Sequence, residues 1–344
     1  MIDLRSDTVT QPTPAMREAM YRAEVGDDVM GEDPTINRLE KMAAERTGKP
    51  SALFIPSGTM GNLVALLAHC QRGEEVILGD IAHSYLYEAG GMAALGGIHP
   101  RPLPNQPDGT IRLDHIQAAV RPDDPHHPHS RLIALENSHN HCGGAAIPPD
   151  YFAAVREIAD QHRLKVHLDG ARVFNATVAL GIDVRELTQY VDSVTFCLSK
   201  GLSAPVGSLL CGDKDFIYRA RRARKMLGGG MRQAGILAAA GIVAMEQMID
   251  RLAEDHVRAR RLAQGINAMS KFTLDMARVQ TNILFFDLVD NQPTPQQVVD
   301  HLQECGVLLS YYPGEGFRAV THCWIDDQGI ETALAALKEA VTLP

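Results

Sequence analysis

Two residues with complementary chemistry stand about one strand–helix–strand unit apart. Asp169 follows the predicted strand 165–168, and Lys200 follows the predicted strand 193–197. A desolvated lysine amine can become neutral and nucleophilic, and a carboxylate can keep a heteroaromatic ring nitrogen protonated. Alone, Lys200 is typical of a surface residue and Asp169 of a helix N-cap. Their spacing matches one βαβ crossover, so both side chains can emerge at the same edge of a parallel sheet, where open α/β sheets bind ligands.

A turn of small residues could hold a phosphate. Residues 57–62 (Ser-Gly-Thr-Met-Gly-Asn) lie between a predicted strand, 52–55, and a predicted helix, 59–71. Small side chains let backbone N–H groups approach an anion, and a helix N-terminus favours negative charge. A plain tight turn with a Ser or Thr cap is an equally good explanation of this motif alone. A second phosphate contact can come from the glycine-rich segment 228–232, which follows several basic residues.

The fourth feature is a histidine, His83, in the segment 80–85. Its flat ring can stack on an aromatic cofactor, and it titrates near neutral pH. Together, the amine, the carboxylate, the small-residue turn and this ring predict pyridoxal 5'-phosphate as the cofactor. The sequence has no Walker A lysine motif, no GxGxxG and no GxSxG. Nucleoside triphosphates, dinucleotides and α/β-hydrolase chemistry therefore lack their usual signatures.

Strands that alternate with helical patterns predict how these residues are positioned. Short apolar runs at 52–55, 75–78, 131–135, 165–168, 193–197 and 207–210 alternate with helical segments, which favours an α/β fold with a mostly parallel sheet flanked by helices. After a long predicted helical region over 232–269, the pattern changes to a small α+β arrangement with strands at 282–288, 307–311 and 318–325. We predict a large cofactor-binding domain over 1–247, with the N-terminal segment contributing to the site, and a small C-terminal domain over 248–344.

The composition excludes several classes of protein. The 344 residues carry 33 basic and 42 acidic side chains, a net charge of −9, so no global field would attract nucleic acid or anionic lipid. The longest apolar stretch, 235–245, is too short to span a membrane, and no signal peptide is apparent. The six cysteines are dispersed, as reduced thiols of a cytoplasmic protein would be. We expect a cytoplasmic enzyme with a small-molecule substrate and neither nucleic-acid nor membrane partners.

The chain resembles the low-specificity L-threonine aldolases, which are pyridoxal-phosphate-dependent enzymes of fold type I, the aspartate-aminotransferase group. The matching motifs run almost end to end, at 3–10, 26–34, 57–62, 135–140, 167–172, 198–202, 228–235 and 318–322. The resemblance implies a carbon–carbon lyase that cleaves L-threonine, L-allo-threonine or both to glycine and acetaldehyde by a retro-aldol reaction. It also implies tolerance for other β-hydroxy-α-amino acids and a role in glycine biosynthesis and amino-acid metabolism.

The resemblance implies roles around the cofactor ring for four residues. Lys200 would bind the cofactor covalently, and Asp169 would face its pyridine nitrogen. His83 would stack on the ring, and Arg172 would lie beside the cofactor.

The phosphate is implied to lie at the small-residue turn. Gly58 and Thr59 would hold it, helped by Lys225 and Arg232 from a neighbouring subunit. Relatives complete their sites across a dimer, so the resemblance implies a homotetramer built as a dimer of dimers.

The amino-acid substrate is implied to lie beside the cofactor. Ser6, Arg172 and Arg318 would bind its carboxylate, because a guanidinium group can form two parallel hydrogen bonds with a carboxylate. His126 would lie near the β-hydroxyl group. The proton of that hydroxyl would pass to His83, to His126 or to a bound water.

Other functions are also weighed. Transamination, β-elimination or decarboxylation could occur on the same fold, because the site and not the fold sets the reaction. The motifs at 3–10 and 26–34 favour the aldolase, since they belong to that family rather than to pyridoxal-phosphate enzymes in general. A cofactor-binding regulator would need a DNA-reading segment, for which the sequence shows no candidate. No metal is expected, because the prolines and irregular spacing argue against a prepared site among His126, His127, His129, His139, His141 and Cys142.

Overall fold

A seven-stranded sheet organises the larger part of the molecule. The computed structural model describes residues 1–290 and 292–342. Within the sheet, β8 alone runs opposite to the other six strands, so the predicted α/β fold with a mostly parallel sheet is confirmed. The strands in spatial order are β2 (Ser51–Ile55), β8 (Ser208–Gly212), β7 (Ser193–Cys197), β6 (Lys165–Asp169), β5 (Ser130–Glu136), β3 (Glu75–Gly79) and β4 (His99–Leu103).

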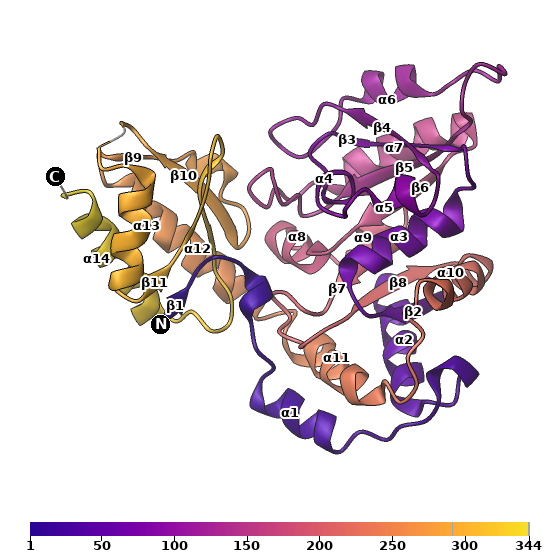
Figure 1. The fold of residues 1–344 in the computed structure, drawn as a ribbon, viewed down its shortest axis with the longest axis horizontal. Coiled ribbons are helices and arrows are strands. Elements are labelled where there is room, and N and C mark those ends of the chain that lie inside the picture. Colours follow the sequence, from indigo (N-terminus) through magenta and orange to yellow (C-terminus); the bar gives the residue numbers. More distant parts are fainter. Residues whose placement is uncertain (291, 343–344) are drawn as a thin grey trace.

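Helices cover both faces of this sheet (Figure 1). Successive side chains of a strand point to opposite faces. In β2, Ala52 and Phe54 join one hydrophobic cluster, and Leu53 and Ile55 join another. The first face packs against α1 (Pro14–Tyr21), α2 (Pro34–Thr47), α6 (Leu113–Ala119), α7 (Pro149–His162), α8 (Val173–Leu180), α9 (Val184–Thr188) and α11 (Gly235–Gln247). The second face packs against α3 (Gly58–His69), α5 (Gly91–Ala94) and α10 (Lys214–Met226). None of the described helices is long and apolar enough to cross a membrane.

The parallel strands bring several chain segments to one edge of the sheet. Glu136, the last residue of β5, is the register partner of Asp169, the last residue of β6. The next strand, β7, ends at Cys197, three residues before Lys200. Because the carboxyl ends of parallel strands meet at one edge, the loops that follow these strands can form a common site.

A second body, drawn in orange and yellow in Figure 1, contains most of the C-terminal part of the chain. Its antiparallel sheet has the order β12 (Ser310–Tyr312), β13 (Gly316–Val320), β10 (Ile283–Leu288) and β9 (Phe272–Thr273). The sheet shares one hydrophobic core with α12 (Leu252–Asn267), α13 (Pro295–Glu304) and α14 (Asp327–Ala340). The N-terminal strand β1 (Ile2–Asp3) pairs in parallel with β11 (Val307–Leu308), and Leu4 packs in the same core. The first residues of the chain therefore lie against this second body.

The structure differs from the sequence-based elements in several places, such as the strand predicted over 307–311, which is the two strands β11 and β12. The predicted helical region 232–269 is two helices, α11 and α12, separated at residues 248–251. The strand predicted over 318–325 ends at Val320, and the Ile325 N–H then bonds the carbonyl of His322 in a turn. Strand β4 was not predicted because two of its five residues are proline. Proline is tolerated at this position because β4 lies at the edge of the sheet.

A glycine sets how closely α3 approaches the sheet. A Cβ atom at Gly61 would lie 2.8 Å from Cγ2 of Thr195 in β7. We expect Gly61→Ala to lower the free energy of unfolding by roughly 1–3 kcal/mol, because α3 would have to move away from β7. Denaturant unfolding would measure the change.

The control is Gly91→Ala, where the new Cβ atom would meet Leu63 at 3.6 Å, an ordinary contact. We expect this variant to be no less stable than the unmodified protein. Equal stability of Gly61→Ala and the unmodified protein would contradict the close approach.

Candidate active site

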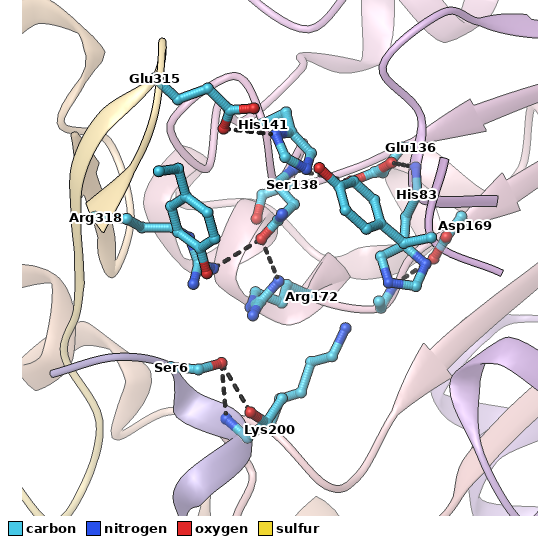
Figure 2. Close-up of a pocket in the computed structure, with 15 residues that line it drawn as sticks. Ser6, His83, Glu136, Ser138, His141, Asp169, Arg172, Lys200, Glu315 and Arg318 are labelled. Atoms are coloured by element: carbon cyan, nitrogen blue, oxygen red, sulfur yellow. Dashed lines mark hydrogen bonds and ion pairs between the residues drawn. The ribbon is translucent and has the colours of Figure 1, made fainter. Parts of the chain in front are cut away.

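One pocket gathers most of the residues predicted to bind the cofactor ring and the substrate. Figure 2 shows side chains that converge on it from the N-terminal segment, from the ends of the sheet strands and from the C-terminal body. The predicted residues that line it are Ser6, His83, Asp169, Arg172, Lys200 and Arg318. Other residues that line it are Thr8, Tyr87, Glu136, Ser138, Asn140, His141, Ala171, Tyr312 and Glu315.

Asp169 and Lys200 are two charged residues that line this pocket. The Oδ1 atom of Asp169 accepts the Ala171 N–H at 3.1 Å, and Oδ2 accepts from Nδ2 of Asn62 at 2.7 Å. Burial and the nearby Glu136 raise the pKa of Asp169, while the positive charge of Lys200 opposes that shift. No described residue forms a hydrogen bond with Nζ of Lys200, whose carbonyl oxygen accepts from Thr10 Oγ1. The pocket thus holds an available amine and a buried carboxylate.

His83 is fixed from two sides. It begins the short helix α4 (His83–Leu86), and its backbone N–H donates to Oε2 of Glu136 at 2.8 Å. Its ring Nδ1 lies 3.0 Å from Oε1 of Glu88, a carboxylate that is almost completely buried. This hydrogen bond raises the pKa of His83, although burial opposes the shift. One third of the His83 side chain stays accessible (33%), so the ring can serve the pocket.

Two buried guanidinium groups form the opposite side of the pocket. Arg172 donates to both carboxylate oxygens of Asp7, from Nε at 2.8 Å and from Nη2 at 2.6 Å. Arg172 Nη1 and Arg318 Nη2 both donate to Oδ1 of Asn140, at 3.2 and 2.8 Å (Figure 2). Burial opposes ionisation of Asp7, but the charge and hydrogen bonds of Arg172 outweigh it and hold the pKa of Asp7 well below its usual range.

The positive charge of Arg318 is not neutralised by an ion pair among the described residues. Arg172, in contrast, is paired with Asp7. Burial and the charge of Arg172 lower the pKa of Arg318 to about 10. A carboxylate ligand at this place would satisfy the unpaired charge and gain charge-assisted hydrogen bonds. The site is therefore suited to the carboxylate of an amino acid.

Several residues of the site were not singled out from the sequence. Asp7, Asn62 and Asn140 stand in the motifs 3–10, 57–62 and 135–140, but no role was assigned to them. Glu136 carries the same signal as Asp169, a carboxylate directly after an apolar strand, and could have been found by it. Glu88 had no signal, because only the folded loop brings it to His83 and Asn62.

The remaining predicted site residues do not line the pocket. Gly58 and Thr59 begin α3, one turn before Asn62, and Ser57 caps the helix by accepting from the Met60 N–H. That cap leaves the first helical N–H groups available for an anion.

Three of these residues lie at the surface. Lys225 lies in the last turn of α10, and Arg232 is 56% exposed and pairs with Asp27 at 2.8 Å. The His126 side chain is 88% exposed and pairs with Asp124 at 2.7 Å. The sequence-based roles of all these residues stay predictions. The histidines at 126–141 and Cys142 do not form a group of three metal ligands in the part of the chain that the structure describes.

These residues fit pyridoxal phosphate. The amine of Lys200 has no described partner, the Asp169 carboxylate is buried without a guanidinium partner, and the N-terminus of α3 is one turn from the side chain that contacts Asp169. An amine, an acidic partner for the pyridine nitrogen and an anion site are the groups that this cofactor requires. Together with a mostly parallel sheet and a C-terminal α+β body, they define a pyridoxal-phosphate enzyme of fold type I.

Comparison with known proteins identifies the family. The family model described as beta-eliminating lyase matches residues 3–289, and the chain belongs to this family. It is 50% identical over 322 residues to the low-specificity L-threonine aldolase of Escherichia coli K12, covering 94% of each chain. It is 47% identical over 346 residues to the low-specificity L-threonine aldolase 1 of Arabidopsis thaliana, covering 99% of this chain and 96% of that protein.

A solved structure agrees with the fold. The threonine aldolase of Leishmania major superposes with a TM-score of 0.84 at 20% identity, covering 99% of this chain and all of that one (100%). The resemblance stated from the sequence, the lyase class, fold type I and the pyridoxal phosphate cofactor are confirmed.

The buried Arg172–Asp7 pair predicts a pH-dependent stability. We expect Asp7→Asn to lose about 3–5 kcal/mol of unfolding free energy at neutral pH, because Arg172 would keep a buried charge without its partner. The folded-state pKa of Asp7 is lowered, so its contribution is complete above the unfolded pKa of about 4 and is lost as the pH falls further. The difference in unfolding free energy between the unmodified protein and Asp7→Asn should therefore be constant from about pH 5 to 7 and shrink below about pH 4.

Asp3→Asn is the matched control. Asp3 pairs with Arg5, whose side chain is half exposed, so this change should cost less than about 1 kcal/mol. Chemical denaturation at several pH values would measure both variants. An Asp7→Asn protein as stable as Asp3→Asn at neutral pH would contradict the role of the pair.

Proposed function

We propose that this chain cleaves L-threonine, L-allo-threonine or both to glycine and acetaldehyde by a retro-aldol reaction, and accepts other β-hydroxy-α-amino acids. The observation that carries the proposal is the pocket with two different sides. The guanidinium groups of Arg172 and Arg318, which share the acceptor Asn140, lie on one side, and Lys200, Asp169 and His83 lie on the other. Such a pocket suits an amino acid whose reacting bond must lie close to the cofactor. The names of the curated relatives support the choice of threonine as substrate.

The proposed mechanism divides the work among residues of this chain. Arg318 and Arg172, with Ser6, bind the substrate carboxylate and so fix the orientation of the bond between Cα and Cβ. Lys200 holds pyridoxal phosphate through its amine, and Asp169 holds a proton at the pyridine nitrogen. When bound, pyridoxal phosphate supplies the electron sink for the broken carbon–carbon bond.

We assign the remaining predicted contacts to an assembled enzyme. Gly58 and Thr59 bind the phosphate, and Lys225 and Arg232 reach it from a neighbouring subunit of a homotetramer, a dimer of dimers. The exposure of Arg232 and the first N–H groups of α3 that the Ser57 cap leaves available support this arrangement. The large domain spans 1–247 and the small domain 248–344, and the enzyme acts in the cytoplasm in glycine biosynthesis.

The experiment that tests the reaction measures acetaldehyde released from L-threonine and from L-allo-threonine. We expect release from at least one isomer by the cofactor-loaded protein, and a loss of at least about 10³-fold in Lys200→Ala, because the variant lacks the amine that holds the cofactor. The ratio of the two rates gives the stereochemical preference.

Two other outcomes would count against the proposal. Cofactor binding without acetaldehyde would exclude the aldol reaction. Pyruvate formed from L-serine would instead favour β-elimination, the reaction that the family description names.

The proton acceptor is tested by a pair of histidine variants. His83 lines the pocket, and the His126 side chain is at the surface, so we propose His83 as the group that takes the β-hydroxyl proton. We expect His83→Asn to lower kcat by roughly 10²-fold or more and to remove the acid limb of the pH–rate profile. His126→Asn should keep that limb. The opposite result would assign the proton to His126, and two unchanged profiles would assign it to water.

A further inference from the structure

A chain of buried hydrogen bonds leads from the core of the larger body to the pocket. His69 Nε2 lies 2.7 Å from Oγ of Ser193, which lies 2.8 Å from Nδ1 of His167. His167 Nε2 lies 3.4 Å from Oδ1 of Asn62. Burial lowers the pKa of both histidines to about 3, so each ring is neutral at physiological pH. Each neutral ring has one donor nitrogen and one acceptor nitrogen.

Two buried carboxylates fix which way the Asn62 amide faces, because only the amide nitrogen can donate to them. The amide oxygen then faces His167 and only accepts, so Nε2 of His167 carries the ring proton and Nδ1 accepts from the Ser193 hydroxyl. The amide nitrogen of Asn62 is the group that contacts the carboxylates. It donates to Oε1 of Glu88 at 2.8 Å and to Oδ2 of Asp169 at 2.7 Å.

The same Glu88 oxygen also faces His83. Oε1 of Glu88 lies 3.0 Å from Nδ1 of His83, and an ionised carboxylate can only accept. Burial raises the pKa of Glu88, but the hydrogen bonds from His83 and Asn62 favour its charged form. The proton of a neutral His83 ring therefore lies on Nδ1, which leaves Nε2 as a lone-pair acceptor. No described residue forms a hydrogen bond with that second nitrogen.

Glu88 differs in this respect from the other groups near His83. Glu136 binds the backbone N–H of His83 and not its ring, and the ring of Tyr87 lies 5.8 Å from that of His83 at an interplanar angle of 34°. Asp169 and Lys200 act on His83 only through their charges. Among the described residues, Glu88 alone can select the ring tautomer.

We propose that Glu88 is a positioning residue, which holds His83 in the tautomer whose Nε2 accepts the β-hydroxyl proton of the substrate. This inference rests on the retro-aldol function proposed above. In the step, the O–H bond of the substrate breaks and its proton bonds to Nε2. The O–H electron pair becomes the carbonyl bond of the aldehyde as the bond between Cα and Cβ breaks. The glycine fragment keeps the pair from that bond and takes up one proton.

The first test is spectroscopic and needs no turnover. Nitrogen NMR of the cofactor-loaded protein labelled with ¹⁵N-histidine distinguishes the two neutral tautomers, and the His83 signals are those that disappear in His83→Asn. We expect the Nδ1–H form in the unmodified protein. A predominant Nε2–H form would overturn the proposal, whatever the substrate is.

The second test is kinetic and uses Glu88→Gln. Loss of the carboxylate lowers the pKa of His83 and removes the selection of its tautomer. We expect kcat for acetaldehyde release to fall by roughly tenfold to a hundredfold, KM to change less than about threefold, and the acid limb of the pH–rate profile to move to lower pH. Glu88→Asp, which keeps the charge, should recover part of kcat and return the limb toward its original position.

The matched control is Glu339→Gln. Glu339 also lies beside a histidine, 3.6 Å from Nε2 of His301, but on α14 in the C-terminal body. It should leave both kcat and the pH profile unchanged. If the acid limb of the pH–rate profile stays at the same pH in Glu88→Gln as in the unmodified protein, the inference is overturned. Failure of the unmodified protein to release acetaldehyde would instead overturn the proposed function, and the NMR result would still report on Glu88.

Discussion

The buried ion pair between Asp7 and Arg172 joins the parts of the molecule that form the pocket. Asp7 belongs to the N-terminal segment, and Arg172 follows the central strand β6. Asn282, directly before β10 of the C-terminal body, donates to the same carboxylate at 3.3 Å. Asn175 in turn donates to Asn282 at 2.9 Å. Burying two charges is costly, and the cost is offset only where the geometry and the additional hydrogen bonds are good. The pair therefore requires the N-terminal segment, the sheet edge and the second body to meet in one arrangement.

In that arrangement, one side of the pocket is positively charged and the other side is lined by acidic residues. Arg318 adds a positive charge beyond the one that Asp7 neutralises, whereas Glu88, Glu136 and Asp169 are buried together on the other side. An amino acid with a β-hydroxyl group has a matching polarity, with its carboxylate at one end and its proton-donating groups at the other. Charges in a site of low dielectric constant interact strongly, so this separation both orients the ligand and controls the protonation of the groups around it.

The sequence was informative where the physical cause is local. Short continuous apolar runs located the strands, and the spacing between Asp169 and Lys200 indicated that they share a sheet edge, as the strand order requires. Contacts between segments that are distant along the chain have no periodic pattern in the sequence from which they could be predicted. Asp7 and Arg172 are 165 positions apart, and Glu88 meets Asn62 across 26 positions, so neither contact follows from spacing. The exposed position of His126 has the same origin, because a motif specifies a loop but not where the loop packs.

The small residues at the start of α3 have a packing role that does not depend on any ligand. A Cβ atom at Gly58 would lie 2.7 Å from Sγ of Cys197, and one at Gly61 would lie 2.8 Å from Thr195. Both contacts are with β7, so the glycines let α3 approach that strand closely. The close approach lets Asn62 reach Asp169 and Glu88, and it places the N-terminus of the helix beside the same sheet edge. One steric condition thus fixes both the position of the α3 N-terminus and the amide that links the two carboxylates, which explains why the motif is made of such small residues.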